Sequence, residues 1–389
     1  MSKPYDPLAS VQAAGPPGTI SFVYGLPDPE TFPGNDLKRC FDRVLREKAA
    51  LALQYGPEQG FGPLIDYLRE KILLKEGITL ERPQIKLTGG ASQALDHLCT
   101  LLTRPGEYLL VEAPTYHEAL QLFRNHGLRP LSIPTDDDGL IVDELAASLQ
   151  FLKKKRAKAR FLYTIPTFQN PSGITLSEER REAVLVLAEK EDLLIVEDDV
   201  YFELAYEPLN VSPLFSLDKN DNVIRLGSFS KIIAPGLRLG WMMGPVEIID
   251  QLTKSGLRRM GGGAHPLTAN AVAMYCQENL LEPHLEFVRT VYSKRRDVML
   301  EALEAMMPDG ISWTRPGGGF FVWIILPETL PVVEIVKWAK EEGILLLAGD
   351  PFFAGTSPQQ HLRLAFSYVH PEKIREGIKK FAHILKAHL

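Results

Sequence analysis

The sequence predicts an α/β fold: a large domain with a mainly parallel sheet, followed by a smaller α+β domain. Between residues 84 and 226, short apolar runs alternate with longer helical patterns, which is typical of parallel strands covered by helices on both faces. After residue 280 one long helical pattern gives way to mixed strands and helices. We therefore expect a large domain over residues 36–280, with residues 36–55 belonging partly to the small domain, and a small domain over residues 281–389.

The composition is that of an ordinary globular protein, and it excludes several classes. The chain has 389 residues and a formal net charge of −6, which favours neither nucleic acid nor an anionic membrane as a partner. No apolar run reaches the roughly 18 residues of a membrane-spanning helix, and the polar first residues do not resemble a signal peptide. Cys40, Cys99 and Cys276 are widely spaced, so we expect reduced thiols of a cytoplasmic protein and no metal site.

The first 35 residues are rich in proline and glycine, which predicts an extended N-terminal arm and not a packed unit. Residues 37–53 then have helical periodicity. A turn at residues 55–60 leads into a second amphipathic helix over residues 63–75. The arm could serve as a mobile element beside a binding site, because its glycines permit rearrangement.

The alternating region predicts five strands, namely residues 85–88, 108–111, 160–165, 193–196 and 223–226. Helical patterns follow the first three, over residues 92–102, 117–125 and 178–190. Ligands of such sheets bind at the carboxyl ends of the strands, so functional residues should follow these runs directly. Beyond them we expect helices at residues 247–259, 267–280, 283–306, 332–342 and 371–388, and strands at 319–325, 344–347 and 361–366. The basic run at 153–160 is interpreted as a solvated helix end.

The most informative stretch follows the fifth strand, at residues 227–241. It holds two hydroxyls, Ser228 and Ser230, and two cations, Lys231 and Arg238, with a Pro-Gly break between the cations. Hydroxyl donors and a planar guanidinium suit a phosphate group. A lysine beside that anion is a candidate nucleophilic amine for Schiff-base chemistry, although a Ser-x-x-Lys alone is more often a surface loop.

Candidate residues also follow the other strands. Gly90, Ala91 and Ser92 open the helix after the first strand, where backbone N–H groups can bind an anion. Tyr116 follows the second strand and could stack on a planar cofactor or be a core aromatic. Asn170 begins an Asn-Pro-Ser-Gly segment that by itself indicates a turn.

Three carboxylates, Glu197, Asp198 and Asp199, end the fourth strand. Buried carboxylates are costly unless they are paired, so either a cationic ligand or a structural cap or salt bridge should lie there. Adjacent residues of an extended segment point to opposite faces, so Asp198 and Asp199 should have different partners. Arg363 interrupts an apolar strand and could be an edge-strand salt bridge.

Together these motifs resemble the class I and II, fold-type I pyridoxal 5'-phosphate (PLP) aminotransferases. The similarity is greatest to the branch of 2-aminoadipate, kynurenine and aromatic aminotransferases, and it extends from about residue 20 to the last helix. It implies a three-layer PLP-transferase large domain, a smaller α+β domain and a homodimer with shared active sites. The matching motifs stand in the family's order and contain Gly90, Tyr116, Asn170, Asp198, Ser228 and Arg363.

The resemblance implies a role for each matching residue. Lys231 would form the Schiff base with PLP, Asp198 would pair with the pyridine nitrogen, and Tyr201 would contact O3′. The other cofactor contacts would be Tyr116 and Asn170 at the ring and, at the phosphate, Gly90, Ala91, Ser92, Ser228, Ser230, Arg238 and Tyr55 of the neighbouring subunit. Ala91 departs from the family's usual serine, so only its backbone N–H can serve. The substrate would contact Arg363, Asn170, Gly25 and Tyr24, with Arg363 on its carboxylate.

The reaction that the resemblance implies moves the amino group of an L-amino acid to a 2-oxo acid, with 2-oxoglutarate as the expected acceptor. We expect 2-aminoadipate or an aromatic or other bulky donor, because no second arginine is identifiable as a clamp for a short acidic side chain. Two alternatives stay open: another PLP reaction such as β-elimination, and a PLP-binding regulatory module. The second is disfavoured because only some 20 residues precede the match, too few for a DNA-reading domain.

Overall fold

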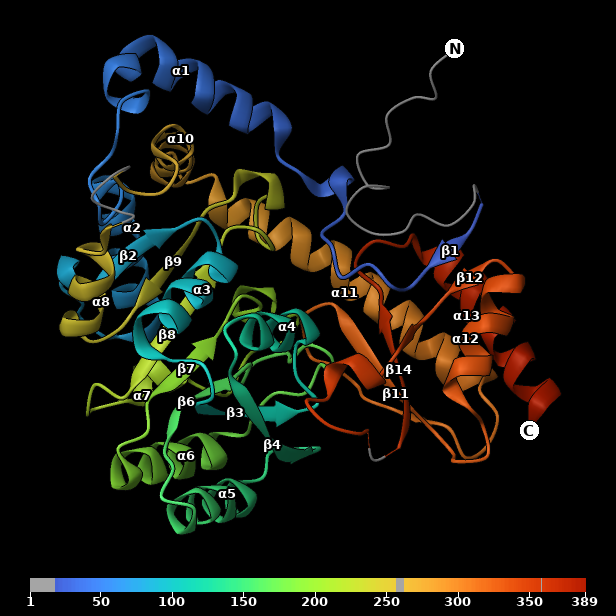
Figure 1. The fold of residues 1–389 in the computed structure, drawn as a ribbon. Helices are drawn as coiled ribbons and strands as arrows, with labels where there is room; N and C mark the ends of the chain where they lie inside the picture. The colour runs from blue at the N-terminus through green and yellow to red at the C-terminus, as the bar shows by residue number, and fades with distance from the viewer. Residues whose placement is uncertain (1–17, 257–261, 358) are drawn as a thin grey trace.

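The computed structural model describes residues 18–256, 262–357 and 359–389, and its largest element is an eight-stranded sheet (Figure 1). The strand order is β2-β9-β8-β7-β6-β3-β4-β5. The strands are β2 (Ile85–Thr88), β3 (Tyr108–Ala113), β4 (Arg129–Asp136), β5 (Gly139–Leu140), β6 (Ala159–Thr164), β7 (Ile195–Asp198), β8 (Val223–Ser228) and β9 (Gly240–Met243). Strands β4, β3, β6, β7 and β8 run parallel, whereas β9 is antiparallel to both neighbours. The predicted mainly parallel α/β sheet is confirmed.

Helices cover both faces of this sheet, which makes three layers. Leu110 and Leu162 pack with the helices α5 (Val142–Lys154), α6 (Glu178–Glu191) and α7 (Leu214–Leu217). Leu109 and Phe161, their neighbours in the chain, belong to the cluster on the other face. That cluster includes α2 (Gly62–Glu76), α3 (Ala91–Leu102), α4 (His117–Asn125), α8 (Val246–Thr253) and α10 (Pro266–Gln277). Successive strand residues point to opposite faces, so each apolar strand fills two cores.

Three strands of the sheet, β4, β5 and β9, were not predicted. In β4, Pro130 and Pro134 interrupt the apolar run and only Ile133 is fully buried, so the pattern of a buried strand is absent. Strand β9 was missed because its first residues were interpreted as the end of the motif at residues 227–241. It lies so close to its neighbours that a Cβ at Gly240 would stand 2.6 Å from the Gly227 carbonyl oxygen and 2.8 Å from Gly90 Cα. Only glycine fits there.

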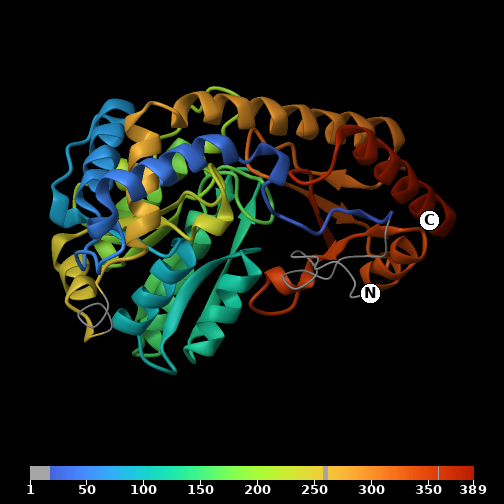
Figure 2. The same cartoon turned by 90° about the horizontal axis from the view of Figure 1, so that it is seen from above.

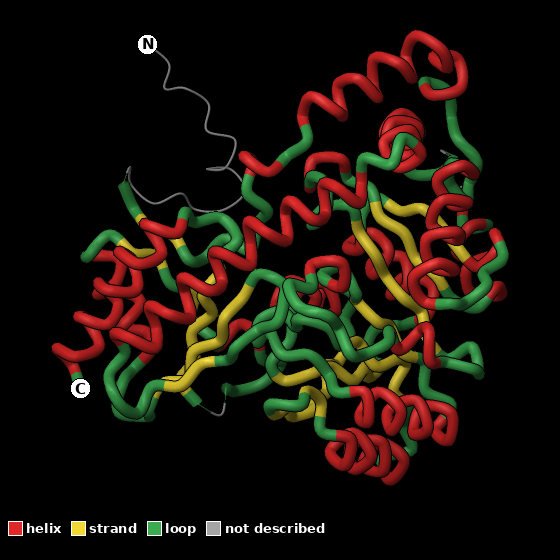
Figure 3. The backbone as a smooth tube through the Cα atoms, turned by 180° about the vertical axis from the view of Figure 1, so that it is seen from behind, coloured by secondary structure: helices red, strands yellow, loops and turns green. Residues whose placement is uncertain are grey.

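The C-terminal part forms a second, smaller sheet with antiparallel order β10-β11-β14-β13. Its strands are β10 (Ser312–Trp313), β11 (Phe321–Leu326), β13 (Leu347–Ala348) and β14 (Gln360–Ala365). Helices α12 (Val332–Glu341) and α13 (Pro371–His388) pack beside it, and the long helix α11 (Leu281–Met306) runs along both parts of the molecule (Figures 2 and 3). The predicted α+β character of this region is confirmed, while the domain boundaries stay a prediction.

The described part of the N-terminal arm is packed, so the expectation of an unpacked arm is wrong for residues 20–32. Strand β1 (Ile20–Ser21) pairs in parallel with β12 (Ile344–Leu345). Phe22 is fully buried, and its carbonyl oxygen accepts a hydrogen bond from Ala365 N at 2.8 Å. Its prolines and glycines obscured the alternating apolar residues that anchor the arm. The arm's first 17 residues, and residues 257–259 of the helix expected at 247–259, lie outside the described residues.

Helix α1 (Gly34–Ala52) follows the arm and packs along α10. Its first half places Cys40 and Val44 in the core, whereas Leu51 and Leu53 at its end are mostly exposed. In the parts of the chain that the structure covers, no helix has both the length and the hydropathy to cross a bilayer.

Candidate active site

The residues singled out in the sequence meet where the carboxyl ends of the parallel strands face the small sheet. Asp198 ends β7, Lys231 follows β8, and Asn170 lies in the loop after β6. Arg363 reaches them from β14 of the small sheet, and its Nη1 donates to Asn170 Oδ1 at 2.9 Å. The site thus joins side chains 193 positions apart in the sequence.

Lys231 is held in an apolar setting that makes its amine unusually acidic. Its Nζ lies 6.0 Å from the centroid of the Tyr201 ring and 5.9 Å from that of Phe320, and it donates to the Gly25 carbonyl oxygen at 3.2 Å. Burial, helped by the positive charge of Arg363, lowers the pKa of Lys231 to about 8. A usable fraction of the amine is therefore neutral, hence nucleophilic and basic, near neutral pH.

Asp198 presents one oxygen that is already bonded and one that is not. The Tyr163 hydroxyl donates to Oδ2 at 2.7 Å, while Oδ1 is buried with no hydrogen-bond partner among the described residues. Burial raises the pKa of Asp198 to about 6, against the lowering effect of the Tyr163 hydrogen bond. The carboxylate is therefore mostly ionised at pH 7 and has an acceptor free for a cationic N–H donor.

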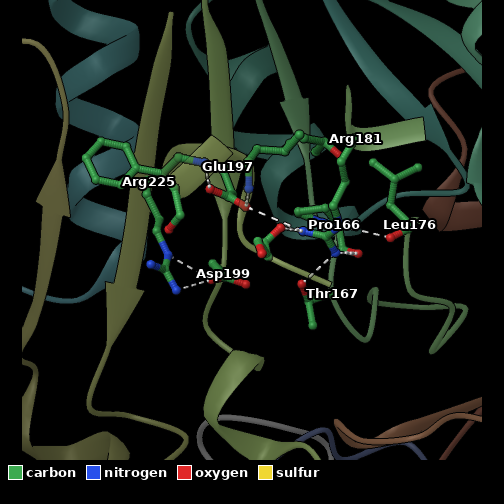
Figure 4. A network of polar contacts seen from close by, with 12 residues as sticks. Pro166, Thr167, Leu176, Arg181, Glu197, Asp199 and Arg225 are labelled. Atoms are coloured by element: carbon green, nitrogen blue, oxygen red, sulfur yellow. Dashed lines mark hydrogen bonds and ion pairs between the residues drawn. The ribbon is translucent and has the colours of Figure 1, made fainter. Parts of the chain in front are cut away.

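The neighbouring carboxylates have partners of their own, as the alternation along the strand predicts (Figure 4). Asp199 Oδ2 accepts from Arg225 Nε at 2.8 Å and Nη2 at 2.7 Å, and Arg225 also bonds Glu76 at 2.8 Å. Glu197 accepts from the backbone N–H groups that begin α7, at 2.8 and 2.9 Å. Both are structural carboxylates, which leaves Asp198 as the one that faces the site.

Arg363 is a buried cation with no acidic side chain bonded to it among the described residues. Its guanidinium carbon lies 4.3 Å from the centroid of the Phe321 ring and 5.0 Å from that of Phe352. Besides Asn170 it bonds only the Val23 carbonyl oxygen, at 2.8 Å, and its Nε has no hydrogen-bond partner in the described chain. Burial lowers the pKa of Arg363 to about 10. A desolvated guanidinium in this state favours a planar anion such as a carboxylate.

A group of donors suited to a second anion lies at the start of α3. Gly90 precedes this helix with a φ of 88°, and Ala91 and Ser92 form its first turn. Arg238 has a φ of 46°, and its Nη2 donates to the Gly89 carbonyl oxygen at 3.0 Å. Free N–H groups at a helix N-terminus together with a guanidinium form an anion site.

Two serines complete this donor group. Ser228 and Ser230 are both buried, and the Ser228 Oγ accepts a hydrogen bond from Ser230 N at 3.1 Å. That bond folds the turn after β8 between Phe229 and Ile232, which are anchored in the core. The stretch Ser228–Lys231 is thus a rigid turn and not the surface loop of the alternative interpretation.

Tyr116 and Tyr201 flank this space. Tyr116 stands at the start of α4, and burial together with nearby negative charges raises its pKa to about 12. Tyr201 is buried edge-on against Phe320 and Phe321, with ring centroids 5.5 and 5.9 Å apart, and burial raises its pKa as well. Both hydroxyls therefore stay protonated and can donate hydrogen bonds.

Gly25 and Tyr24 lie on the N-terminal arm. A Cβ at Gly25 would stand 2.5 Å from Cζ of Phe321, so only glycine lets the arm approach the Arg363 pocket this closely. The Tyr24 ring is buried and packs edge-on against Tyr368, with centroids 5.9 Å apart. Tyr55 lies elsewhere: it follows α1 with 77 % of its surface exposed, away from the site within a single chain.

Sequence reasoning missed the buried polar residues that support the site. Arg181 of α6 is fully buried and donates to the carbonyl oxygens of Pro166 at 2.7 Å and Leu176 at 2.9 Å and to Thr167 Oγ1 at 3.0 Å (Figure 4). It thereby fixes the loop that carries Asn170. Tyr163 was counted only as an apolar strand residue. Nothing in the local pattern marks either residue, because their partners are distant in the sequence.

Comparison with known proteins shows the family to which the chain belongs. Residues 33–381 match the family model described as aminotransferase class I and II. The chain belongs to this family. The aminotransferase is 41 % identical over 372 residues to aromatic-amino-acid aminotransferase 1 of Thermococcus litoralis, covering 94 % of this chain and 88 % of that one. It is 36 % identical to the 2-aminoadipate transaminase of Thermus thermophilus, over 95 % of this chain and 91 % of that protein.

The aminotransferase also matches solved structures over nearly its whole length. One is the kynurenine aminotransferase of Pyrococcus horikoshii in complex with PMP, with a TM-score of 0.92, 38 % identity, and coverage of 98 % of this chain and 93 % of that one. The predicted family, fold and enzyme class are therefore confirmed, and the cofactor is PLP. The site fits it, because Asp198 Oδ1 and Arg363 Nε are buried polar atoms still without partners in the described chain.

Proposed function

We propose that this aminotransferase transfers the amino group of an L-amino acid with a bulky side chain, such as 2-aminoadipate or an aromatic amino acid, to 2-oxoglutarate. The observation that carries the proposal is Arg363, a buried guanidinium without an acidic partner in the described chain, set between Phe321 and Phe352. A substrate α-carboxylate supplies the missing charge in bidentate geometry. The flanking aromatic rings favour donors with large apolar surfaces.

Each catalytic role follows from an atom of the site. Bound PLP supplies an electron sink for the carbanionic Cα of the substrate. Asp198 Oδ1 holds the proton on the ring nitrogen, which maintains that sink. Lys231 would hold the cofactor through its amine, and its neutral Nζ would move the proton from the substrate Cα as general base. Arg363 fixes the substrate carboxylate so that the Cα–H bond faces Lys231 Nζ.

The remaining residues bind and orient the cofactor. Asn170 Oδ1 accepts a hydrogen bond from Arg363, so its amide nitrogen would be left to donate to O3′, as would the Tyr201 hydroxyl. Tyr116 would stack on the ring. The phosphate group would be held by Ser228, Ser230, Arg238, the first turn of α3 (Gly90, Ala91, Ser92) and Tyr55 of a second subunit. Gly25 and Tyr24 line the substrate side.

A panel of amino donors tests the proposed specificity. We expect kcat/KM for 2-aminoadipate and phenylalanine to exceed that for aspartate by at least about tenfold, because even a small difference in pocket contacts changes kcat/KM by about this factor. Leucine and glutamate complete the series, with 2-oxoglutarate as acceptor, in the wild type and in Tyr24→Gly. A clear preference for aspartate would overturn the proposed donor class. Pyruvate and ammonia released without a second oxo acid would favour β-elimination, and tight PLP binding without any turnover would favour a regulatory module.

We further propose a cytoplasmic homodimer with active sites shared between subunits. Leu51, Leu53 and Tyr55 at the end of α1 are 56, 66 and 77 % exposed, and a cluster of this kind favours association. The three cysteines are buried and unpaired, which fits a reducing compartment.

A mixing experiment tests the shared sites. If Tyr55 serves the partner's cofactor, Tyr55→Phe and Lys231→Ala proteins should complement each other, because a mixed dimer contains one site with both native residues. We expect activity to rise toward about a quarter of the wild-type value after subunit exchange, the statistical yield of such sites. Each variant mixed with itself is the control. A protein that sediments as a monomer at micromolar concentration would exclude the arrangement.

A further inference from the structure

The Tyr163 hydroxyl has a single described role, which is to donate a hydrogen bond to Asp198 Oδ2 at 2.7 Å. We infer that Tyr163 is a positioning residue that holds the Asp198 carboxylate in its charged form and with Oδ1 directed at the ring nitrogen of PLP. This inference rests on the proposed role of Asp198. It assigns a function in the reaction to a residue that neither touches the substrate nor belongs to a recognised motif.

The geometry makes Tyr163 a rigid donor. It lies in β6 directly beside Val196 of β7, two residues before Asp198, so the backbone ladder fixes its distance from the carboxylate. The side chain is fully buried, and Phe123 packs edge-on against its ring with centroids 5.4 Å apart. A buried hydroxyl must find an acceptor. The acceptor that it meets is the carboxylate of the site, and a hydrogen bond to a charged group is among the stronger ones.

The surroundings of Asp198 explain why such a donor is needed. Burial is the largest influence and raises the pKa of Asp198, and the negative charges of Asp199 and Glu112 act in the same direction. The Tyr163 hydrogen bond and the charge of Lys231 oppose them. Tyr116 and Tyr201 also face this carboxyl group. Burial raises the pKa of both tyrosines, so their hydroxyls stay protonated and uncharged. Of these two influences that favour the charged form, the charge of Lys231 would remain without Tyr163.

Loss of the hydroxyl should therefore have two effects. The carboxylate would have both oxygens unsatisfied and could rotate away from the ring nitrogen. Its pKa would also rise, so a larger fraction would be a neutral acid near pH 6 to 7 and unable to accept the proton of a pyridinium. The second effect depends on pH, whereas a loss of packing does not, and this difference separates positioning from a structural role.

The test is the affinity of the cofactor-free protein for PLP, measured by fluorescence titration at pH 6, 7 and 8. For Tyr163→Phe, we expect the ratio of its Kd to the wild-type Kd to be about fivefold larger at pH 6 than at pH 8, the effect of a rise of roughly one unit from a pKa of about 6. The direction follows because the Asp198 carboxyl group is mostly ionised in both proteins at pH 8. At pH 6 a substantial fraction of it stays ionised only in the wild type. A ratio that is the same at all three pH values would overturn the inference.

Tyr292→Phe is the matched control. Tyr292 is also fully buried, and its hydroxyl bonds Thr31 Oγ1 and Asp28 N, both at 3.1 Å. Tyr292→Phe removes a buried tyrosine hydroxyl that bonds Thr31 and Asp28 instead of Asp198, and we expect a ratio of its Kd to the wild-type Kd near one at every pH. Chemical unfolding of the cofactor-free proteins verifies that both variants are folded at the titration temperature.

Asp198→Asn separates failure of the inference from failure of the proposed function. If Asp198 faces PLP as proposed, Asp198→Asn weakens PLP binding, and adding Tyr163→Phe to it causes no further pH-dependent loss. Wild-type affinity in Asp198→Asn would overturn the proposed role of Asp198 itself. Weakened binding in Asp198→Asn, combined with a pH-independent ratio for Tyr163→Phe, would overturn the role of Tyr163 alone.

Discussion

Lys231→Ala is expected to abolish transamination while PLP still binds without a covalent bond. The amine is the general base in the proposed reaction and the attachment point of the cofactor, and loss of a residue with both functions should lower kcat by at least about 10⁴-fold. The anion-binding turn, Arg238 and Asp198 are unchanged, so the affinity for PLP should fall but persist. Borohydride reduction followed by mass spectrometry of the intact protein measures covalent attachment, and steady-state assays measure kcat.

Lys254→Ala is the control for this variant. Lys254 pairs with Asp250 at 2.7 Å at the end of α8, and most of its side chain is exposed. Its loss should change neither the reducible attachment nor kcat. If Lys231→Ala still carried PLP covalently after reduction, at wild-type occupancy, another lysine would be the attachment site and the proposed reaction would be wrong.

The charges of the site suit the reaction as well as the positions do. Burial lowers the pKa of both Lys231 and Arg363, and the charge of Arg363 lowers that of Lys231 further, whereas the negative charge of Asp198 raises it. An excess of buried positive charge is unfavourable without ligands. A cofactor phosphate and a substrate carboxylate both supply negative charge, so binding relieves the repulsion between cations. The cofactor-free site is thus prepared for anions before they arrive.

Much of the fold was predictable because its strands are short apolar runs and its helices have long periodic patterns. Helices α4 and α13 begin and end at the predicted residues. Strand β4 was missed because prolines interrupt it, and the packing of the arm was missed because its prolines and glycines mask Ile20 and Phe22. In each case a tertiary contact, and not a local preference, forms the element.

The candidate site was predictable to the extent that its residues directly follow strands. Strand alternation predicted different partners for Asp198 and Asp199, and the structure gives them different partners. The choice of Asp198 as the residue at the ring nitrogen came from the family resemblance. Tyr163 and Arg181 could not be found in this way. Their importance lies in which polar atom they meet after folding, for example Arg181 with the Ser212 carbonyl oxygen 31 positions away, at 3.1 Å. A residue's neighbours across a sheet are not written in its local sequence.

The second large effect is expected for Asp198→Asn, with Asp199→Asn as its matched control. A neutral amide cannot hold a proton on the ring nitrogen, so the electron sink weakens, and kcat should fall by about 10²- to 10⁴-fold. The unfolding free energy of the cofactor-free protein should change little or rise, because Asp198 is buried with no cation bonded to it in the described residues, and burial penalises its charge.

Asp199→Asn should show the opposite pattern. Asp199 is bonded to the buried Arg225, which then keeps only Glu76 as an acidic partner bonded to it in the described chain. Breaking a buried ion pair on one side costs about 3 kcal/mol of unfolding free energy, whereas kcat should fall much less than in Asp198→Asn. Steady-state kinetics and urea unfolding of both variants measure the contrast. Equal losses of kcat would mean that the wrong carboxylate has been placed at the ring nitrogen, since the two side chains differ by one position in the chain but lie on opposite faces of the strand.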